Sequence, residues 1–218
     1  ASIVEENELL EFKNDSGKKK KINFAILKEY LKKSERPIVL AGYGIHLSNT
    51  RFKLFKFLIK RNIPAVFTYG GTDLIPYEDD LHIGKIGIKG DRPGNFALQN
   101  SDLIIVLGSS LSIPVIGYEY ELFGRDSKII CVDIDQNEHK KKTIKPDEIF
   151  NCDLNDFFDY SIQNIDFYGR DEWINKCNYW KTKWPVFQKD YLDTSDGVNM
   201  YLILEKINEF SDENSIVV

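Results

Sequence analysis

The chain has 218 residues, a formal net charge of −5, 42% hydrophobic residues and 29% charged residues. This length suffices for one large or two small domains with a buried core, and the acidic balance argues against a general affinity for nucleic acid. No apolar run approaches the roughly 20 residues that a membrane-spanning helix needs, and the acidic opening "ASIVEENELLEF" lacks the pattern of a signal peptide.

The first 62 residues predict a linker, a helix, a strand and a second helix. Residues 1–22 have the composition of a linker, and residues 23–33 have the amphipathic pattern of a helix. "PIVLA" at 37–41 predicts a strand buried on both faces. The second helix is expected over 49–62, with Ser48 as its N-cap. Its inward side chains are predicted to be Phe52, Phe55, Leu58 and Ile59.

Strands and helices alternate along the middle of the chain. Further strands are predicted over 64–68, 102–108, 128–135 and 148–153, and further helices over 95–101 and 154–162. A loop containing Gly84, Gly87, Gly90 and Gly94 is expected before the first of these helices. The alternation predicts an α/β fold, a Rossmann-like doubly wound parallel sheet of about five to six strands in three α/β/α layers.

Small and acidic residues follow the predicted strands. They are Gly42, Gly44, Gly70, Gly71, Gly108, Ser109, Asp133 and Asp135. Because open parallel sheets bind ligands at the carboxyl ends of their strands, we expect a binding crevice there. Asp133 is suited to accept a hydrogen bond from a ribose hydroxyl, and helix capping or loop solvation is an equal alternative for it.

The turn after the first strand has only part of a phosphate-binding fingerprint. Residues 42–44, "GYG", supply two glycines of the GxGxxG pattern, but Leu47 occupies the third position. A tight turn that needs positive φ explains both glycines without a phosphate. The sequence also lacks HExxH, GxSxG and GxxxxGK[ST] motifs, so we predict no catalytic and no metal-binding residues.

The last fifty or so residues change in character. The segment 170–184 places Trp173, Cys177, Trp180 and Trp184 on one helical face. We expect this face to dock against a neighbouring domain, and stacking on nucleic-acid bases is the alternative. A further helix is expected over 198–210, and "SIVV" at 215–218 has the pattern of a beginning strand, which predicts that the chain is a piece of something longer.

The cysteine pattern indicates the redox environment in which the protein works. Cys131, Cys152 and Cys177 are odd in number, widely spaced and without a CxxC pair. This pattern argues against a disulfide framework and a zinc site, and it favours a reducing, cytoplasmic location. We expect each cysteine to be a buried small apolar residue.

Three segments carry a resemblance to a known family. They are "RPIVLAGYGIHLS", "NIPAVFTYGGTDLIPYEDDLHIGKIGIKGDRPGNFALQNSDLIIVLGSSL" and "SKIICVDIDQNE". In this order they resemble the central domain of thiamine-diphosphate-dependent enzymes, with acetolactate-synthase-like proteins as the nearest kin. The resemblance covers about residues 23–165. It implies that residues 1–22 are a linker from an N-terminal domain, and that 166–218 hold a linker helix and the start of a C-terminal cofactor-binding domain.

The resemblance implies that the catalytic groups belong to the first and third domains of the family and not to the central domain. In this family thiamine diphosphate lies between the first and third domains, usually of two subunits, with a glutamate from the first and a GDG…N motif for magnesium and diphosphate in the third. Ser195-Asp196-Gly197 followed by Asn199 has a different spacing. We therefore expect this chain to be non-catalytic alone. Its parent would be a lyase or transferase that decarboxylates or joins 2-oxo acids, as a homodimer or homotetramer.

Some relatives carry a nucleotide in the central domain, FAD in acetolactate synthases and ADP in some acyl-CoA relatives. By resemblance the candidate cofactor-binding residues are Gly42, Gly44, Gly90, Gly108, Ser109 and Asp133. Both arginines of the FAD-binding run after the third predicted strand are replaced, by Ser110 and Pro114. Since arginine forks are strong phosphate partners, a vacant crevice is favoured over bound flavin, although Lys89 offers a point charge.

Two alternatives from other classes remain. The first is a stand-alone FAD- or ADP-binding or regulatory module. The second is a sirtuin-like deacylase, because "AGYGIHLS" superficially resembles the GAGIS turn of that family. The missing CxxC pair disfavours the deacylase.

Overall fold

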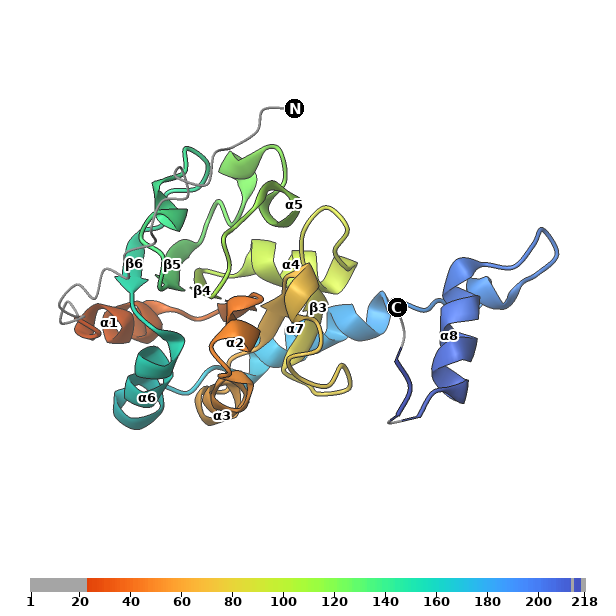
Figure 1. The fold of residues 1–218 in the computed structure, drawn as a ribbon, viewed down its shortest axis with the longest axis horizontal. Helices are drawn as coiled ribbons and strands as arrows, with labels where there is room; N and C mark the ends of the chain where they lie inside the picture. Colours follow the sequence, from red (N-terminus) through yellow and green to blue (C-terminus); the bar gives the residue numbers. More distant parts are fainter. Residues whose placement is uncertain (1–22, 213, 217–218) are drawn as a thin grey trace, which may run out of the picture.

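The structure is a computed structural model that describes residues 23–212 and 214–216, so the linker predicted over 1–22 lies outside the described residues. A six-stranded sheet has the order β3-β2-β1-β4-β5-β6, and every pair is parallel (Figure 1). The strands are β1 (Pro37–Ala41), β2 (Ala65–Phe67), β3 (His82–Lys85), β4 (Leu103–Leu107), β5 (Lys128–Asp133) and β6 (Glu148–Asn151). This is the strand order of dinucleotide-binding Rossmann folds, and it confirms the predicted fold class.

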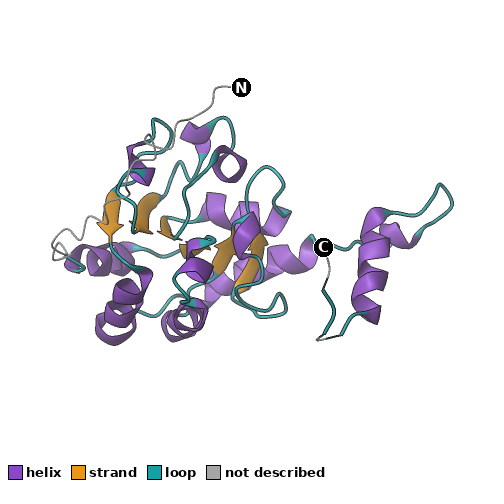
Figure 2. Cartoon of the chain, in the orientation of Figure 1, coloured by secondary structure: helices purple, strands orange, loops and turns teal. Residues whose placement is uncertain are grey.

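Helices cover both faces of the sheet (Figure 2). They are α1 (Ala25–Lys33), α2 (Gly44–Leu47), α3 (Arg51–Arg61), α4 (Arg92–Asn100), α5 (Ile113–Ile116), α6 (Leu154–Asn164), α7 (Asp171–Lys183) and α8 (Met200–Phe210). Short 3₁₀ turns are η2 (Tyr69–Gly71), η3 (Tyr120–Leu122), η4 (Glu138–Lys140) and η5 (Lys189–Leu192). Val39 and Ala41 of β1 pack with α1, α3 and α6, whereas Ile38 and Leu40 pack with α4 and α7. Burial on both faces explains why β1, β2 and β4 are continuous apolar runs.

The edge strand β3 lies in the segment that we predicted to be a loop. It has four residues, with Gly84 at φ 145°, and its register with β2 shifts between Ala65 and Val66. A short strand with a central glycine has little of the β-branched pattern that marks β1 and β4 in the sequence. The helix that follows, α4, begins at Arg92, three residues before the predicted start.

The buried face of α3 agrees with the prediction only in part. Leu58 is buried and Phe55 packs against the core as predicted, but Phe52 and Ile59 are exposed, and Leu54, Phe57 and Arg61 are buried instead. Both sets have helical spacing, so periodicity alone does not choose between them. The Arg61 guanidinium favours the observed face, because its Nη2 donates to the carbonyl oxygens of Ser161 and Ile162 on α6, each at 2.8 Å.

Ser48 does not cap α3. Ser48 follows the last residue of the additional four-residue helix α2, and its hydroxyl donates back to the carbonyl oxygen of Gly44, the first residue of that helix, at 2.8 Å. Thr50 is the residue that precedes α3. The cap prediction was wrong because the residues before Ser48, expected to be only a turn, form the short helix α2 (Gly44–Leu47), and Ser48 lies at its C-terminal end.

The aromatic face of α7 packs on the same α/β domain. Trp173 and Cys177 are buried with residues of α4, and the indole N–H of Trp173 donates to the carbonyl oxygen of Pro37 at 2.9 Å. The tryptophans are therefore packing residues of this domain.

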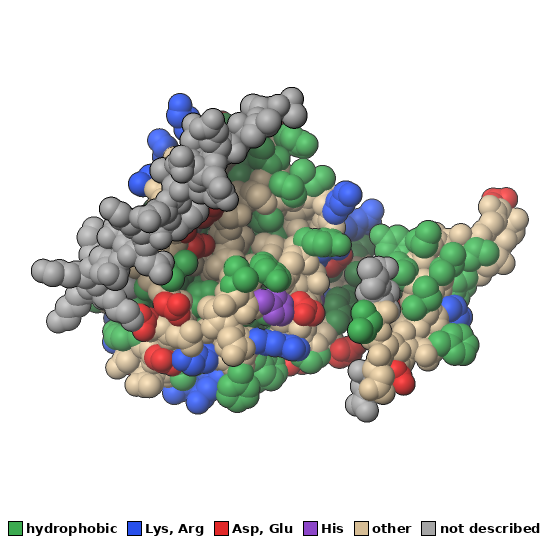
Figure 3. Space-filling model, viewed as in Figure 1, with side chains coloured by type: hydrophobic (Ala, Val, Ile, Leu, Met, Phe, Trp, Pro, Cys, Tyr) green, Lys and Arg blue, Asp and Glu red, His purple; other side chains and the backbone are tan. Residues whose placement is uncertain are grey.

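Helix α8 is joined to the rest through η5 and stands apart from the sheet (Figure 1). Hydrophobic side chains gather on its surface, with Met200 and Phe210 among them (Figure 3). Ser215 and Ile216 are not in a strand, and residues 217–218 lie outside the described part.

Candidate functional site

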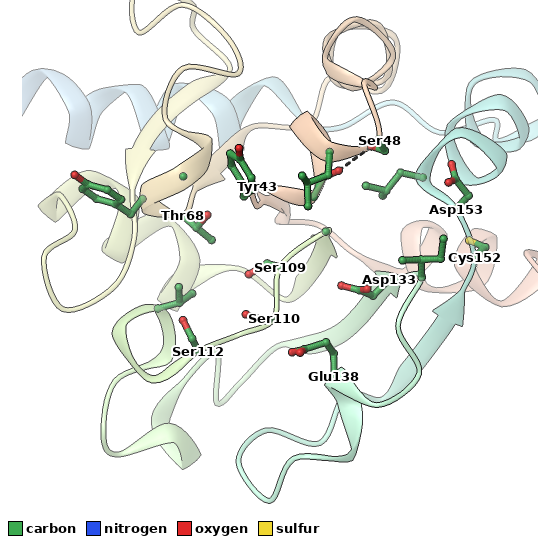
Figure 4. A pocket seen from close by; sticks show the side chains of 18 of the residues that line it. Tyr43, Ser48, Thr68, Ser109, Ser110, Ser112, Asp133, Glu138, Cys152 and Asp153 are labelled. Atoms are coloured by element: carbon green, nitrogen blue, oxygen red, sulfur yellow. Dashed lines mark hydrogen bonds between the residues drawn. The ribbon is translucent and has the colours of Figure 1, made fainter. Parts of the chain in front are cut away.

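A crevice of about 550 Å³ lies beyond the carboxyl ends of β1, β2, β4 and β5 (Figure 4). It lies where the strand order reverses between β1 and β4, the usual position of ligand sites in open α/β sheets. The volume falls in the range of small-molecule pockets. The lining residues are Tyr43, Gly44, Leu47, Ser48, Thr68, Tyr69, Gly70, Gly108, Ser109, Ser110, Ser112, Pro114, Val115, Asp133, Ile134, Glu138, Cys152, Asp153 and Leu154.

The glycine turns form the floor of the crevice by direct backbone contact. The N–H of Gly42 donates to the Leu107 carbonyl and the N–H of Gly44 to the Gly108 carbonyl, each at 2.9 Å. A Cβ on Gly42 would lie 2.3 Å from the Gly108 oxygen. The N–H of Gly108 in turn donates to the Val132 carbonyl at 3.1 Å. All three N–H groups are therefore used within the protein and are not directed at a phosphate.

The loop after β4 is held in an unusual backbone conformation. Gly108 has φ 59° and Leu111 has φ 48°, and the latter is a left-handed conformation that a branched side chain seldom adopts. Between them Ser109 is 94% buried, and its Oγ accepts a long bond of 3.4 Å from the Leu111 N–H. Such conformations persist where the surroundings impose them, often at ligand sites.

Three carboxylates line the other side of the crevice (Figure 4). Asp133 Oδ1 accepts from the Asp135 N–H at 2.9 Å, and Asp153 caps α6 through the Asn155 N–H at 2.7 Å. Glu138 forms an ion pair with Lys141, whose Nζ also donates to the Ser110 carbonyl at 3.2 Å. No Lys, Arg or His belongs to the crevice lining in the described part of the chain.

The structure brings together four of the six candidate cofactor-binding residues. Gly44, Gly108, Ser109 and Asp133 line the crevice. Gly42 lies directly behind the lining, against Gly108. Gly90 is in the turn after β3, where its N–H donates to the Gly87 carbonyl at 2.9 Å, and it does not reach the crevice, because β3 is at the edge of the sheet.

Several lining residues were not singled out from the sequence. Thr68 directly follows β2, and its position at a strand end was an available signal. Glu138 and Asp153 follow β5 and β6 by a few residues, and the fold rather than a motif brings them to the crevice. Lys89, considered as a point charge for phosphate, is exposed and does not line the crevice.

The crevice does not fit the diphosphate of FAD or ADP. Among the described residues its lining carries three carboxylates and no cationic side chain, and the N–H groups of Gly44 and Gly108 are already bonded. Phosphate sites instead use Arg or Lys side chains and free N–H groups at helix N-termini. Helix α2, next to the turn, has only four residues.

Among the described residues no group of three or more His, Cys, Asp or Glu is placed to hold a metal ion. His46 pairs with Asp73 at 2.9 Å, outside the crevice lining, and His82 is buried under Tyr77 and Phe67. Ser195-Asp196-Gly197 lies in an exposed turn before α8. No helix that the structure describes is long and apolar enough to cross a membrane.

The fold and the crevice define a Rossmann-like α/β domain with a ligand-sized site at its switch point. A sequence model described as "Thiamine pyrophosphate enzyme, central domain" matches residues 25–159, which is more than half of the chain. The chain therefore belongs to this family, and the resemblance inferred from the sequence is confirmed.

Its relatives include acetolactate synthase large subunits. Over 105 residues it is 36% identical to a probable acetolactate synthase large subunit of Methanococcus aeolicus, covering 48% of this chain and 17% of the relative. It is 27% identical to the large subunit of acetolactate synthase isozyme 1 of Escherichia coli K12, over 84% of this chain and 32% of the relative. It is also 27% identical to the acetolactate synthase large subunit of Lactococcus lactis, over 85% of this chain and 32% of the relative. The chain thus spans no more than about a third of these relatives.

Proposed function

We propose that this chain supplies the central domain of a thiamine-diphosphate-dependent enzyme of acetolactate-synthase type, which decarboxylates or joins 2-oxo acids. The observation that carries the proposal is the family match over residues 25–159, supported by relatives named as acetolactate synthase large subunits. The comparisons give no support to a stand-alone FAD- or ADP-binding module.

Within this proposal the domain is a scaffold. Residues 23–165 form the central domain, 1–22 link it to an N-terminal domain, and 166–218 lead into a C-terminal domain. Thiamine diphosphate and Mg²⁺, which supply the carbon chemistry when bound, are held by those two domains in a cytoplasmic homodimer or homotetramer. The buried sheet and the packing of α7 on α4 give the scaffold its rigidity.

The test is turnover by the protein from the complete reading frame, supplied with thiamine diphosphate, Mg²⁺ and a panel of 2-oxo acids that includes pyruvate. We expect carbon dioxide release and an acyloin-type product, both lost when thiamine diphosphate is omitted. The 218-residue chain is expected to show no turnover. If the complete protein, folded and supplied with cofactor, consumes none of the 2-oxo acids, the proposal is wrong.

A further inference from the structure

His82, the first residue of β3, is a buried titratable side chain that the proposed function does not use. It is 3% exposed, and its ring stacks on Phe67 of β2 with 4.4 Å between the ring centroids. The Tyr77 ring meets it edge-on at 5.2 Å. Its Nε2 lies 3.3 Å from the carbonyl oxygen of Thr72, which can only accept, so Nε2 carries the proton. Its Nδ1 has no hydrogen-bond partner among the described residues, so His82 fits this position as a neutral ring.

The surroundings of His82 disfavour a second proton on its ring. Burial lowers the pKa of His82, and the Lys181 ammonium of α7 acts in the same direction. The Asp91 carboxylate acts in the opposite direction, but it already accepts the Lys85 N–H at 2.8 Å. Tyr77 stays neutral, because burial raises the pKa of its hydroxyl. A proton on Nδ1 would therefore create a buried cation whose new N–H has no acceptor among the described residues.

The turn that precedes β3, residues 76–81, is bound by helix α7, which packs beside this strand (Figure 1). Lys181 Nζ donates to two carbonyl oxygens of the turn, that of Tyr77 and that of Asp79, the latter at 3.1 Å. The same Nζ lies 4.6 Å from the centroid of the Tyr77 ring, in cation–π contact. We call this turn and the two α7 side chains that bind it, Asn178 and Lys181, the α7 latch. The carboxylates that attract Lys181 in the latch are those of Asp80, Asp79 and Glu78.

The α7 latch is connected to His82 through one shared carbonyl group. The Asp79 carbonyl oxygen accepts from the His82 N–H at 3.0 Å and from Lys181 at 3.1 Å. One helical turn before Lys181, Asn178 Nδ2 donates to the Asp80 carbonyl oxygen at 2.9 Å. A displacement of His82 therefore disturbs the acceptors that hold the C-terminal half of α7.

We propose that the α7 latch is a pH-sensitive device: when the His82 ring takes up a second proton, the turn 76–81 opens and the C-terminal half of α7 loses its contact with the sheet. In the open state His82 is in water and takes up a proton near its ordinary pKa of about 6.5, whereas the closed state does so only at lower pH. The closed latch is therefore fully stable above about pH 6.5 and loses stability as the pH falls below it. This goes beyond the proposed function, because it assigns a conformational change to the helix that follows the central domain.

The test uses tryptophan fluorescence of the 218-residue chain, because its three tryptophans, Trp173, Trp180 and Trp184, lie on α7 or directly after it. Trp180 and Trp184 are half-buried and pack on Phe96 of α4. We expect the emission to move to longer wavelength as the pH falls from about 7.5 to about 5, while the far-ultraviolet circular dichroism is retained. The proposal is overturned if the emission does not move over this range, or if it moves only together with a loss of the circular dichroism signal.

A histidine variant assigns the change to His82. His82→Gln does not titrate and keeps an N–H that can reach the Thr72 carbonyl, so its emission should no longer respond to pH over this range. His46→Gln is the matched control: His46 pairs with Asp73 at 2.9 Å outside the α7 latch, so the response should remain. An unchanged response in His82→Gln, or the same loss of response in His46→Gln, overturns the proposal.

A second variant tests the α7 latch without touching His82, and it decides the question if His82→Gln does not fold. Asn178→Ala removes one hydrogen bond of the latch and no charge, so the pH midpoint of the emission change should rise by about half a pH unit. Asn164→Ala, which removes a side-chain bond within α6, should leave the midpoint unchanged. A midpoint that does not move in Asn178→Ala, or that moves equally in Asn164→Ala, overturns the proposal. Because no turnover is measured, a failure here leaves the proposed function standing, and the reverse also holds.

Discussion

Gly44 and Gly108 are in backbone contact across two neighbouring strand ends: the N–H of Gly44 donates to the carbonyl oxygen of Gly108 at 2.9 Å, and a Cβ on Gly44 would lie 2.7 Å from the Gly108 Cα. This contact joins the turns after β1 and β4 and closes the floor of the crevice. It explains the glycine-rich turn through packing, because the N–H that a phosphate would need is already bonded.

Gly44→Ala should therefore destabilise the domain by about 3 kcal/mol, the upper part of the range for overpacking, because the added methyl group meets backbone atoms that cannot move aside. Gly70→Ala is the matched control in the same crevice. Its Cβ would lie 3.3 Å from the Tyr43 side chain, which is exposed and free to move, so a loss below about 1 kcal/mol is expected. Urea unfolding of both variants measures the difference, and equal losses would refute the packing explanation.

Arg61 should be a strong stabiliser of the α3–α6 contact. Its buried guanidinium donates to the carbonyl oxygens of Ser161 and Ile162 near the end of α6, so Arg61→Ala removes two hydrogen bonds from a charged, buried donor and should cost about 2–3 kcal/mol. Arg125→Ala, at an exposed arginine, should change the free energy of unfolding by less than about 0.5 kcal/mol. A thermal or urea midpoint for Arg61→Ala equal to that of Arg125→Ala would contradict this assignment.

His82 should make the fold sensitive to mild acid. Burial lowers the pKa of His82 below the ordinary histidine value of about 6.5, and nearby Lys181 acts in the same direction. The unfolded chain therefore takes up a proton at a pH where the folded protein does not, and the free energy of unfolding falls as pH falls below about 6.5.

The measurement is urea unfolding at several pH values between about 5.5 and 7.5, around the ordinary histidine pKa. His82→Gln keeps an N–H that can reach the Thr72 carbonyl but does not titrate, so its unfolding free energy should lose most of this slope. A slope that is unchanged in His82→Gln would show that other groups cause the pH dependence.

The buried cysteines should be inert in the folded protein. Burial raises the pKa of the Cys131 and Cys177 thiols, and both side chains are fully enclosed. A thiol reagent at about pH 8 should therefore modify neither until urea unfolds the chain, because the thiolate is the reactive form. Cys152 lines the crevice and can react on its own, so the experiment uses the Cys152→Ser variant, in which any modification comes from Cys131 or Cys177. Rapid native modification of the Cys152→Ser protein would contradict the prediction.

The long buried strands were predictable because their patterns have one interpretation. Residues 37–41 and 103–107 are continuous apolar runs, as a strand covered on both faces requires. β3 has four residues and a central glycine, and α3 has two apolar faces of similar regularity. In both cases tertiary contacts decide the structure, and a local pattern does not contain them.

The crevice was predictable only where its residues directly follow a strand. Gly44, Gly108, Ser109 and Asp133 meet because the carboxyl ends of parallel strands share one edge. Gly90 follows an edge strand and stays apart. The lack of cationic side chains could not be predicted from the sequence, because the chain carries 29 Lys and Arg residues and only the fold shows that none of those within the described residues lines the crevice.

The most direct test of the account is the cofactor content of the protein from the complete reading frame. It would be incubated with thiamine diphosphate, Mg²⁺ and FAD, desalted, and analysed for both organic cofactors. The account predicts that thiamine diphosphate is retained near one per subunit, as the family implies, and that FAD is not retained, because the central crevice is acidic and the N–H groups of Gly44 and Gly108 are used within the protein. Retention of FAD, or failure to retain thiamine diphosphate, would contradict it.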